Sequence, residues 1–428
     1  MNTTKTPRYN TDEIIVGLDI GTTKIACIVG QMNEHGKLEL LGYGKSKSNG
    51  VSRGIVINIE QTVESIQYAV AQAEESANVK IEVVNVGIAG QHISSLQHRG
   101  QLMRPDGEHV ISREDVKNLE DDMRKLKMLP GHEIIHVLPQ EFSIDGEDNI
   151  KEPVGMTGVK LEADFHIITG QVSAAKNIYR CVNRAGLEVK TLILEPIASS
   201  EAVLTNEEKE AGVALVDIGG GTTDIAIFRE SIIRHTAVIP FGGNVITEDI
   251  QKGCTILKRH AEALKAKFGS AISSEMNDKE VVVIPGLQGR KPKEISRKNL
   301  AGIIQARMEE IIEHVHYEIK ASGLSQDLIG GVVLTGGGSQ LKHIRQLFEY
   351  MTGLDCRIGT PDMHLSKAPN RTLTTPLFST GIGLVRLGFQ EETVELETTR
   401  EGAGRRTRKG AGSFWKGIKV FFEEEVND

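Results

Sequence analysis

Two aspartates in this sequence, Asp19 and Asp217, share a local pattern suited to binding phosphate and a metal ion. Each stands in an Asp-Ile-Gly tripeptide, with a pair of threonines shortly after it. Apolar residues flank each segment, which predicts a strand, a tight turn and a second strand. Backbone N–H groups in a glycine turn form a pocket for anions, and a neighbouring carboxylate can hold a hydrated divalent cation. The pattern therefore indicates polyphosphate chemistry.

The repetition of this pattern decides between two interpretations. A single copy would suit an ordinary hairpin as well as a phosphate loop, because glycine-rich turns are common. Two copies far apart indicate two related halves, whose facing hairpins would clamp one polyphosphate with Asp19 and Asp217 near one metal ion. Asp217 is also a candidate catalytic carboxylate. The predicted phosphate ligands are Gly21, Thr22, Thr23 and Lys24 in the first copy and Gly219, Gly220, Gly221, Thr222 and Thr223 in the second.

A third glycine turn follows an apolar run at residues 330–341. Its residues Gly336, Gly337 and Gly338 would let a flat base lie against the backbone. Ser339 is a candidate ligand and the predicted N-cap of a helix over 341–351. These three segments, in this order, resemble the phosphate-one, phosphate-two and adenosine loops of the actin/sugar-kinase/chaperone ATPase superfamily. The resemblance implies ATP and Mg²⁺ in a cleft between two lobes; no GxxxxGK[ST] motif is present.

Composition limits the other possibilities. The 428 residues suffice for two or more domains, and the net charge of −8 argues against nucleic acid as a partner. The four cysteines are scattered and predict neither a disulfide framework nor a zinc site. The N-terminus lacks the pattern of a signal peptide, and no apolar run reaches the roughly twenty residues that a membrane-spanning helix needs.

The segment from about 90 to 164 departs from the superfamily pattern. Residues 136–145 read HVLPQEFSID and residues 153–158 read PVGMTG. They resemble the HVxPQEYxID and NPVGLSG segments of the FtsA family of actin-like bacterial cell division proteins, in which they form subdomain 1C. The similarity extends along nearly the whole chain. It implies recruitment of later division proteins through this subdomain, whereas a structural insertion without a partner is the alternative.

These resemblances define the expected architecture, which is an α/β, two-lobed actin/sugar-kinase/chaperone-ATPase-like fold with an inserted subdomain. The expected parts are 1–89 as subdomain 1A, 90–164 as 1C, 165–200 as the rest of 1A with a connecting helix, 201–250 as 2A, 251–325 as 2B, 326–389 as 2A with the adenosine loop and a second connecting helix, 390–412 as a disordered linker, and 413–428 as an amphipathic helix.

Other candidate site residues each have two interpretations. Glu195, before Pro196, resembles the catalytic glutamate that positions water in related ATPases, but it also suits a simple helix start. Glu262 and Lys265 resemble a pair that contacts ribose and adenine, or they form a surface ion pair. The turn at Gly242, Gly243 and Asn244 resembles one that faces the phosphates.

A basic run over residues 289–298 is unusual in this acidic chain, and a solvated loop is its simplest explanation. The resemblance to FtsA implies instead that subdomain 2B receives the acidic, apolar C-terminal peptide of the tubulin-like protein FtsZ. The cations that would suit this ligand are Arg290, Lys293, Arg297 and Lys298.

The C-terminal segment 413–428 carries the only tryptophan of the chain. Its aromatic and apolar residues would share one face of a helix, which predicts an interfacial membrane anchor behind a flexible basic linker. A helix that docks on its own domain is the alternative. The residues of the predicted membrane-binding face are Phe414, Trp415, Ile418, Phe421 and Phe422.

The sequence thus predicts an ATP-binding, actin-like adaptor that polymerises and tethers FtsZ filaments to the cytoplasmic face of the membrane at the division site. Hydrolysis is expected to be slow at most, with a mainly structural role. The alternatives are a pilus-assembly actin homologue, a small-molecule kinase and a chaperone ATPase, and the last lacks room for a substrate domain after residue 390.

Overall fold

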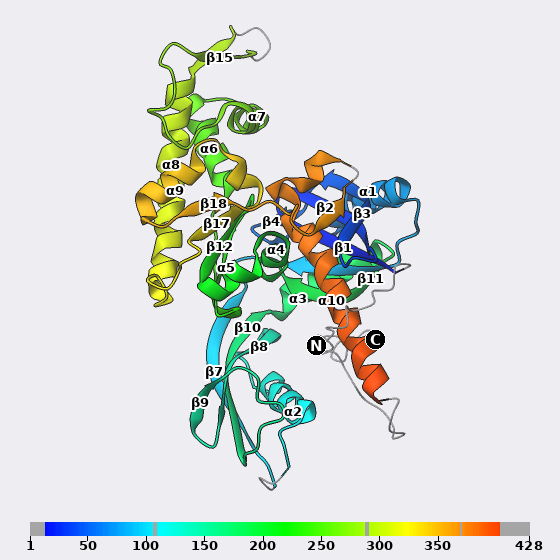
Figure 1. Cartoon of the computed structure of the whole chain (residues 1–428). Coiled ribbons are helices and arrows are strands. Elements are labelled where there is room, and N and C mark those ends of the chain that lie inside the picture. Colours follow the sequence, from blue (N-terminus) through cyan, green and yellow to red (C-terminus); the bar gives the residue numbers. More distant parts are fainter. Residues whose placement is uncertain (1–12, 106–108, 287–290, 369, 403–428) are drawn as a thin grey trace.

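The computed structural model describes residues 13–105, 109–286, 291–368 and 370–402. Two lobes lie side by side, and a third unit extends below them in Figure 1. The first lobe is built on a six-stranded sheet in the order β11-β6-β1-β2-β3-β19. Its elements are β1 (Ile14–Ile20), β2 (Lys24–Met32), β3 (Leu38–Lys47), β4 (Val51–Ser52), β5 (Ile55–Val56), α1 (Ile59–Ala77), β6 (Val83–Ile88), α3 (Val172–Arg184), β11 (Glu188–Leu194) and β19 (Leu365–Lys367).

The second lobe repeats this plan with a five-stranded sheet in the order β14-β13-β12-β17-β18. In both lobes an antiparallel hairpin pairs along its leading strand with a parallel neighbour, β6 beside β1 and β17 beside β12. Its elements are α5 (Asn206–Ala211), β12 (Val213–Ile218), β13 (Thr223–Arg229), β14 (Ile232–Ile239), α6 (Gly243–Cys254), α7 (Lys258–Phe268), β15 (Val281–Ile284), β16 (Lys293–Ser296), α8 (Arg297–Ala321), β17 (Val332–Thr335), α9 (Ile344–Thr352) and β18 (Cys356–Ile358).

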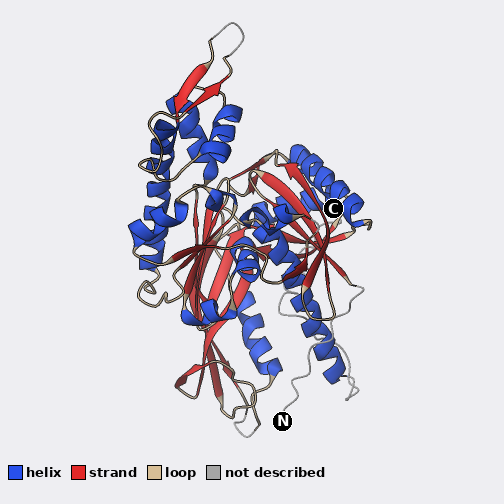
Figure 2. Cartoon of the chain, turned by 45° about the horizontal axis from the view of Figure 1, so that its top comes forward, coloured by secondary structure: helices blue, strands red, loops and turns tan. Residues whose placement is uncertain are grey.

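Two helices, α4 (Glu195–Val203) and α10 (Ser379–Gly402), pack against each other between the lobes. Figure 1 labels both helices, and Figure 2 shows helical segments between the two sheets. Their contact is close, because a Cβ placed on Gly383 would lie 1.8 Å from the carbonyl oxygen of Ala198. Short 3₁₀ turns at Arg371–Thr374 and Pro376–Phe378 lead into α10. The buried apolar residues of both lobes meet around these helices.

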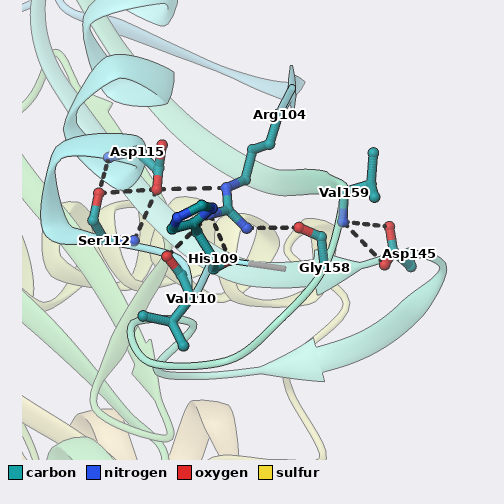
Figure 3. A network of polar contacts seen from close by, with 8 residues as sticks. All are labelled: Arg104, His109, Val110, Ser112, Asp115, Asp145, Gly158 and Val159. Atoms are coloured by element: carbon teal, nitrogen blue, oxygen red, sulfur yellow. Dashed lines mark hydrogen bonds and ion pairs between the residues drawn. The ribbon is translucent and has the colours of Figure 1, made fainter. Parts of the chain in front are cut away.

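The inserted unit is a four-stranded sheet in the order β7-β10-β8-β9, covered by one helix. Its elements are β7 (Ser94–Met103), α2 (Arg113–Arg124), β8 (His132–Ile144), β9 (Glu147–Ile150) and β10 (Lys160–Gln171). Buried Arg104 ties its far end together by donating to the carbonyl oxygens of Gly158 at 2.6 Å and His109 at 2.7 Å (Figure 3). Ser112 and Asp115 cap the start of α2.

The insert also contacts the second lobe. Its strand β8 continues through Pro139 with a bulge at Gln140, since Pro139 pairs with Phe165 and Glu141 pairs with Asp164. The bulge turns Gln140 toward β14, where its side-chain amide donates to the carbonyl oxygen of Ile233 at 2.8 Å. Proline lacks the N–H that a strand ladder uses and often marks a break, but here the strand continues with a bulge.

The structure also differs from two predicted element bounds in the C-terminal part of the chain. Ser339 does not cap a helix over 341–351, because residues Gly337–Gln340 form a 3₁₀ turn and α9 begins only at Ile344. Helix α10 continues to Gly402, so the predicted linker 390–412 begins as helix. The predicted membrane-binding residues at 414–422 lie outside the described residues.

Candidate functional site

The two Asp-Ile-Gly hairpins face each other across the lobes, as the repeat predicts. In the first, Gly21 N–H donates to the Lys24 carbonyl at 3.0 Å, and in the second, Gly219 N–H donates to the Thr222 carbonyl at 3.0 Å. The turns approach closely, because a Cβ on Gly220 would lie 1.9 Å from the Thr23 hydroxyl oxygen. Any side chain at this position would separate the turns.

The third glycine turn joins them from the neighbouring strand. Strand β17 runs parallel to β12 and pairs Thr335 with Asp217, so Gly336 begins its turn beside this carboxylate. Gly336 has φ 79°, and a Cβ there would lie 2.2 Å from Asp217 Oδ1. Both its backbone conformation and its surroundings therefore require glycine.

All three turns border one cavity of about 490 Å³ between the lobes. The predicted site residues that line it are Asp19, Gly21, Thr22, Thr23, Lys24, Glu195, Asp217, Gly219, Gly220, Gly221, Thr222, Gly243, Asn244, Glu262, Lys265, Gly336, Gly337 and Gly338. Three others do not line it: Thr223 donates to the Phe241 carbonyl at 2.8 Å, Gly242 caps α6, and Ser339 donates to the Gly336 carbonyl at 2.8 Å.

Carboxylates dominate the centre of the cavity. Asp19 forms an ion pair with Lys24 of its own hairpin. Asp217 instead accepts hydrogen bonds from the hydroxyls of Ser199 at 2.7 Å and Thr380 at 3.5 Å, which come from α4 and α10. Burial, together with the charge of Asp19, raises the pKa of Asp217. The helices between the lobes therefore orient the carboxylate of the second hairpin.

Asp224 is a fifth acidic residue of the cavity, and the sequence did not single it out. Thr222 Oγ1 donates to Asp224 Oδ2 at 2.9 Å, and Oδ1 is buried without a hydrogen-bond partner among the described residues. Burial and the charge of Asp217 raise its pKa to about 7. Its position was available as a signal, because it is the charged residue that follows the threonines, as Lys24 does in the first copy.

These features fit a hydrated magnesium ion better than a metal held by protein alone. Among the described residues, no group of three or more histidine, cysteine or acidic side chains could hold a metal ion directly. Mg²⁺ usually keeps several waters and binds through one or two carboxylates together with phosphates. Asp224 has a buried oxygen without a hydrogen-bond partner among the described residues, which a cation would stabilise. Burial and Asp19 disfavour the charged form of Asp217, and a nearby cation would favour it.

Glu195 is the first residue of α4, with Pro196 directly behind it as expected for a helix start. Its side chain lines the cavity, and burial and the neighbouring Asp19 raise its pKa well above the usual value. The insert reaches this point, because buried His136 accepts a hydrogen bond from the Leu194 N–H at 3.0 Å. Burial lowers the pKa of His136 to about 3, so the ring is a neutral acceptor. Both interpretations of Glu195 are compatible with this position.

The positions of Lys265 and Glu262 are compatible with an ion pair and with a pair that contacts a nucleoside. They form an ion pair at 2.8 Å and line the cavity together. Lys265 further donates to the Gly243 carbonyl at 2.8 Å and to Thr247 Oγ1 at 2.8 Å, which fixes α7 against the start of α6. Burial lowers the pKa of Lys265.

The predicted partner-binding cations are engaged within the chain. Arg297 pairs with Glu280, Lys298 pairs with Asp278 at 2.7 Å, and Lys293 donates to the Cys254 carbonyl. From residue 293 onward the run is a strand and a helix start rather than a solvated loop, since Lys293 opens β16 and Arg297 opens α8. Arg290 lies outside the described residues.

Comparison with known proteins now bears on this site. The sequence model described as cell division protein FtsA matches residues 214–383, and that of the SHS2 domain inserted in FtsA matches residues 90–169. The cell division protein FtsA of Pseudomonas aeruginosa is 39% identical over 391 residues, covering 91% of this chain and 93% of that protein. This chain belongs to the FtsA family. The FtsA of Escherichia coli K12 is 36% identical and covers 96% of this chain and 98% of its own length.

Solved structures show how this FtsA-family fold relates to others. The PilM–PilN type IV pilus biogenesis complex has a TM-score of 0.64 at 16% identity, covering 88% of this chain and 98% of that chain. MreB5 of Spiroplasma citri bound to AMPPNP has a TM-score of 0.53 at 14% identity, covering 92% of this chain and all of that chain. At these identities the likeness establishes an actin-like fold.

Within the described residues, no helix is long and apolar enough to cross a membrane.

Proposed function

We propose that this chain binds ATP with Mg²⁺ in the cavity between its lobes and anchors FtsZ filaments to the cytoplasmic membrane during division. The observation that carries the nucleotide part is the convergence of three glycine turns and five acidic side chains on one cavity. The turns supply backbone donors for phosphates, and the carboxylates supply the charge that Mg²⁺ requires. Membership of the FtsA family supports the role in division.

The residues have distinct tasks in this proposal. Thr22, Thr23 and Lys24 hold phosphate oxygens from one lobe, and the turn at residues 219–222 holds them from the other. Asp19 and Asp217 orient the waters of the metal ion. The metal, when bound, neutralises phosphate charge. Glu195 faces the same space and is the candidate to orient a water, with hydrolysis slow or regulatory.

Three further parts complete the proposed role. Segment 413–428, predicted from its sequence to be an amphipathic anchor, would place the protein peripherally on the cytoplasmic face of the membrane. Subdomain 2B would receive the FtsZ tail, and the insert would recruit later division proteins. Because one short anchor binds weakly, head-to-tail polymerisation would add avidity. The engaged cations of 2B imply that an FtsZ tail would exchange ion pairs there rather than fill a free basic patch.

Vesicle flotation of FtsZ filaments with Mg²⁺ and ATP tests the role. Full-length protein is compared with a chain ending at Gly412 and with the full-length variant Trp415→Glu, which keeps the tail length but disrupts its apolar face. Filaments should float only with the unmodified full-length protein. If the protein floats and leaves the filaments behind, FtsZ is not the partner and the pilus-type alternative gains. If nothing floats, the tail docks on its own domain, and phosphoryl transfer to small acceptors is tested next.

A further inference from the structure

A small hairpin beside the phosphate turns holds an arginine that the sequence analysis did not single out. Strands β4 and β5 contain two residues each and are joined by Arg53 and Gly54. Both residues have positive φ, 49° and 76°, which is the backbone of a type I′ turn. Asparagine, aspartate and glycine are preferred at the first position of this turn because they tolerate positive φ. Arginine at this position costs conformational energy. An outlier of this kind points to a use for the side chain.

This turn lies against both phosphate hairpins at once. The Gly54 N–H donates to the hydroxyl oxygen of Thr22 at 3.1 Å. The Thr22 hydroxyl can therefore still donate its own hydrogen bond to a phosphate oxygen. On the other lobe, a Cβ placed on Gly221 would lie 2.9 Å from Arg53 Cα. Behind the turn, a Cβ on Gly54 would lie 2.2 Å from the Ala89 carbonyl oxygen. The turn is therefore fixed in place between the two lobes.

The contacts of Arg53 also indicate which part of the proposed nucleotide it would face. Gly336, of the predicted adenosine loop, adjoins Asp217, which lies just before the turn of the second hairpin. Arg53 adjoins Gly221, which lies within that turn. A polyphosphate that runs from Gly336 along the turn toward Gly221 would bring its terminal phosphate to the Arg53 turn. This placement rests on the proposed nucleotide site.

Charge distinguishes Arg53 from the cations already assigned to the cavity. Lys24 is paired with Asp19, and Lys265 is paired with Glu262. Arg53 is exposed, and among the described residues it has no ion-pair partner. A guanidinium is always charged and can donate two parallel hydrogen bonds to one phosphate group.

We propose that Arg53 binds the terminal phosphate and makes the site prefer a nucleoside triphosphate to a diphosphate. The γ-phosphate adds charge and oxygens at the tip of the hairpins, where a diphosphate has none. Arg53 thus acts as a specificity-determining residue. Its hairpin belongs to the first lobe and Gly221 to the second, so this contact also favours the closed arrangement of the lobes when a triphosphate is bound.

The test compares full-length wild type, Arg53→Asn and Arg53→Lys in titrations with Mg²⁺–AMPPNP and Mg²⁺–ADP. Asparagine suits the turn and keeps the backbone contact with Thr22, so the melting temperature without nucleotide should be equal or higher. Arg53→Asn should weaken AMPPNP about tenfold and leave ADP within about twofold, while Arg53→Lys should keep part of the preference.

Three results would overturn the proposal. In the first, Arg53→Asn leaves the ratio of the two affinities unchanged. In the second, it weakens both nucleotides equally, which would mean that the residue only shapes the turn. In the third, Arg53→Lys loses as much preference as Arg53→Asn, which would mean that charge is not the cause. Failure of the wild type to bind either nucleotide would instead refute the proposed function, so the two failures are distinguishable.

Discussion

The two phosphate hairpins share one local sequence pattern but differ in how their aspartates are held. Asp19 is paired with Lys24 from its own hairpin. Asp217 forms no ion pair with any residue that the structure describes, and its hydrogen-bond partners Ser199 and Thr380 come from the helices between the lobes. The second hairpin also carries Asp224 where the first has its lysine. The first hairpin therefore pairs its carboxylate with a cation, whereas the second carries carboxylates that a cation bound with the proposed ligand would neutralise.

The aspartates themselves give the largest expected effect. We expect Asp217→Asn to weaken Mg²⁺–AMPPNP binding about 100-fold, because it removes a buried carboxylate that forms no ion pair among the described residues. Asp19→Asn should weaken binding only about tenfold, because it releases Lys24 to bind phosphate. Isothermal titration measures both affinities. Equal losses in the two variants would break the comparison between the hairpins.

The excess negative charge of the second hairpin should also appear as pH dependence. The pKa of Asp224 in the folded chain is about 7, above the value of about 3.9 for an exposed aspartate. Between these values the folded state binds more protons than the unfolded state, so the free energy of unfolding falls as pH rises. The Asp224→Asn variant should lack this contribution. Between about pH 4.5 and 6.5, its free energy of unfolding should fall by about 1 kcal/mol less per pH unit than that of the wild type.

Urea unfolding of the nucleotide-free protein across this pH range measures the effect. The wild type minus variant difference in unfolding free energy should decrease as pH rises and become flat above about pH 7.5. A difference independent of pH would show that Asp224 is ionised in the folded state throughout, against the burial argument.

The dependence of Asp217 on α4 and α10 gives a third prediction. Gly383→Ala should separate these helices, since its Cβ would lie 1.8 Å from the Ala198 carbonyl oxygen, and should destabilise the protein by about 2 kcal/mol. Gly302→Ala is the matched control, because a Cβ at this position of α8 meets no atom within 4 Å. Gly302→Ala should be neutral or stabilising by up to about 1 kcal/mol. Thermal unfolding compares the two, and similar melting temperatures would contradict the close packing.

The smallest expected effect concerns the hydroxyl that orients Asp217. Ser199→Ala removes the hydrogen bond of 2.7 Å and should weaken Mg²⁺–AMPPNP binding up to about tenfold. Ser200→Ala is the control, because its hydroxyl donates to the Ile197 carbonyl within the same helix. If both variants bind equally well, α4 does not position the carboxylate.

Local motifs explain what the sequence could predict. The repeated Asp-Ile-Gly pattern and the glycine turn at residues 336–338 each lie within a few residues, and the structure brings them to one cavity. The partners of Asp217 could not be predicted, because Ser199 and Thr380 reach it only through packing of distant helices. The Arg53 turn was missed because strands of two residues leave no periodic signal.

The same reasoning explains the corrections. A proline within a strand-like run suggests a break, because proline lacks the N–H that a ladder uses, but at Pro139 a bulge absorbs it while β10 pairs with β8 before and after the proline. The glycine turn before residue 341 suggested an immediate helix, whereas contacts with Ile218 hold the turn in a 3₁₀ form: a Cβ on Gly338 would lie 2.4 Å from Ile218 Cγ2. Both differences come from tertiary contacts.

The central claim is that the two hairpins hold one metal–nucleotide complex between them. A double-mutant cycle tests it directly, with Mg²⁺–AMPPNP affinity measured for the wild type, Asp19→Asn, Asp217→Asn and the double variant, all full length. If both carboxylates act on one hydrated ion, the double variant should lose clearly less than the product of the single losses, with a coupling of about 1 kcal/mol or more. Single variants that bind like the wild type, or losses that simply multiply, would contradict a shared site.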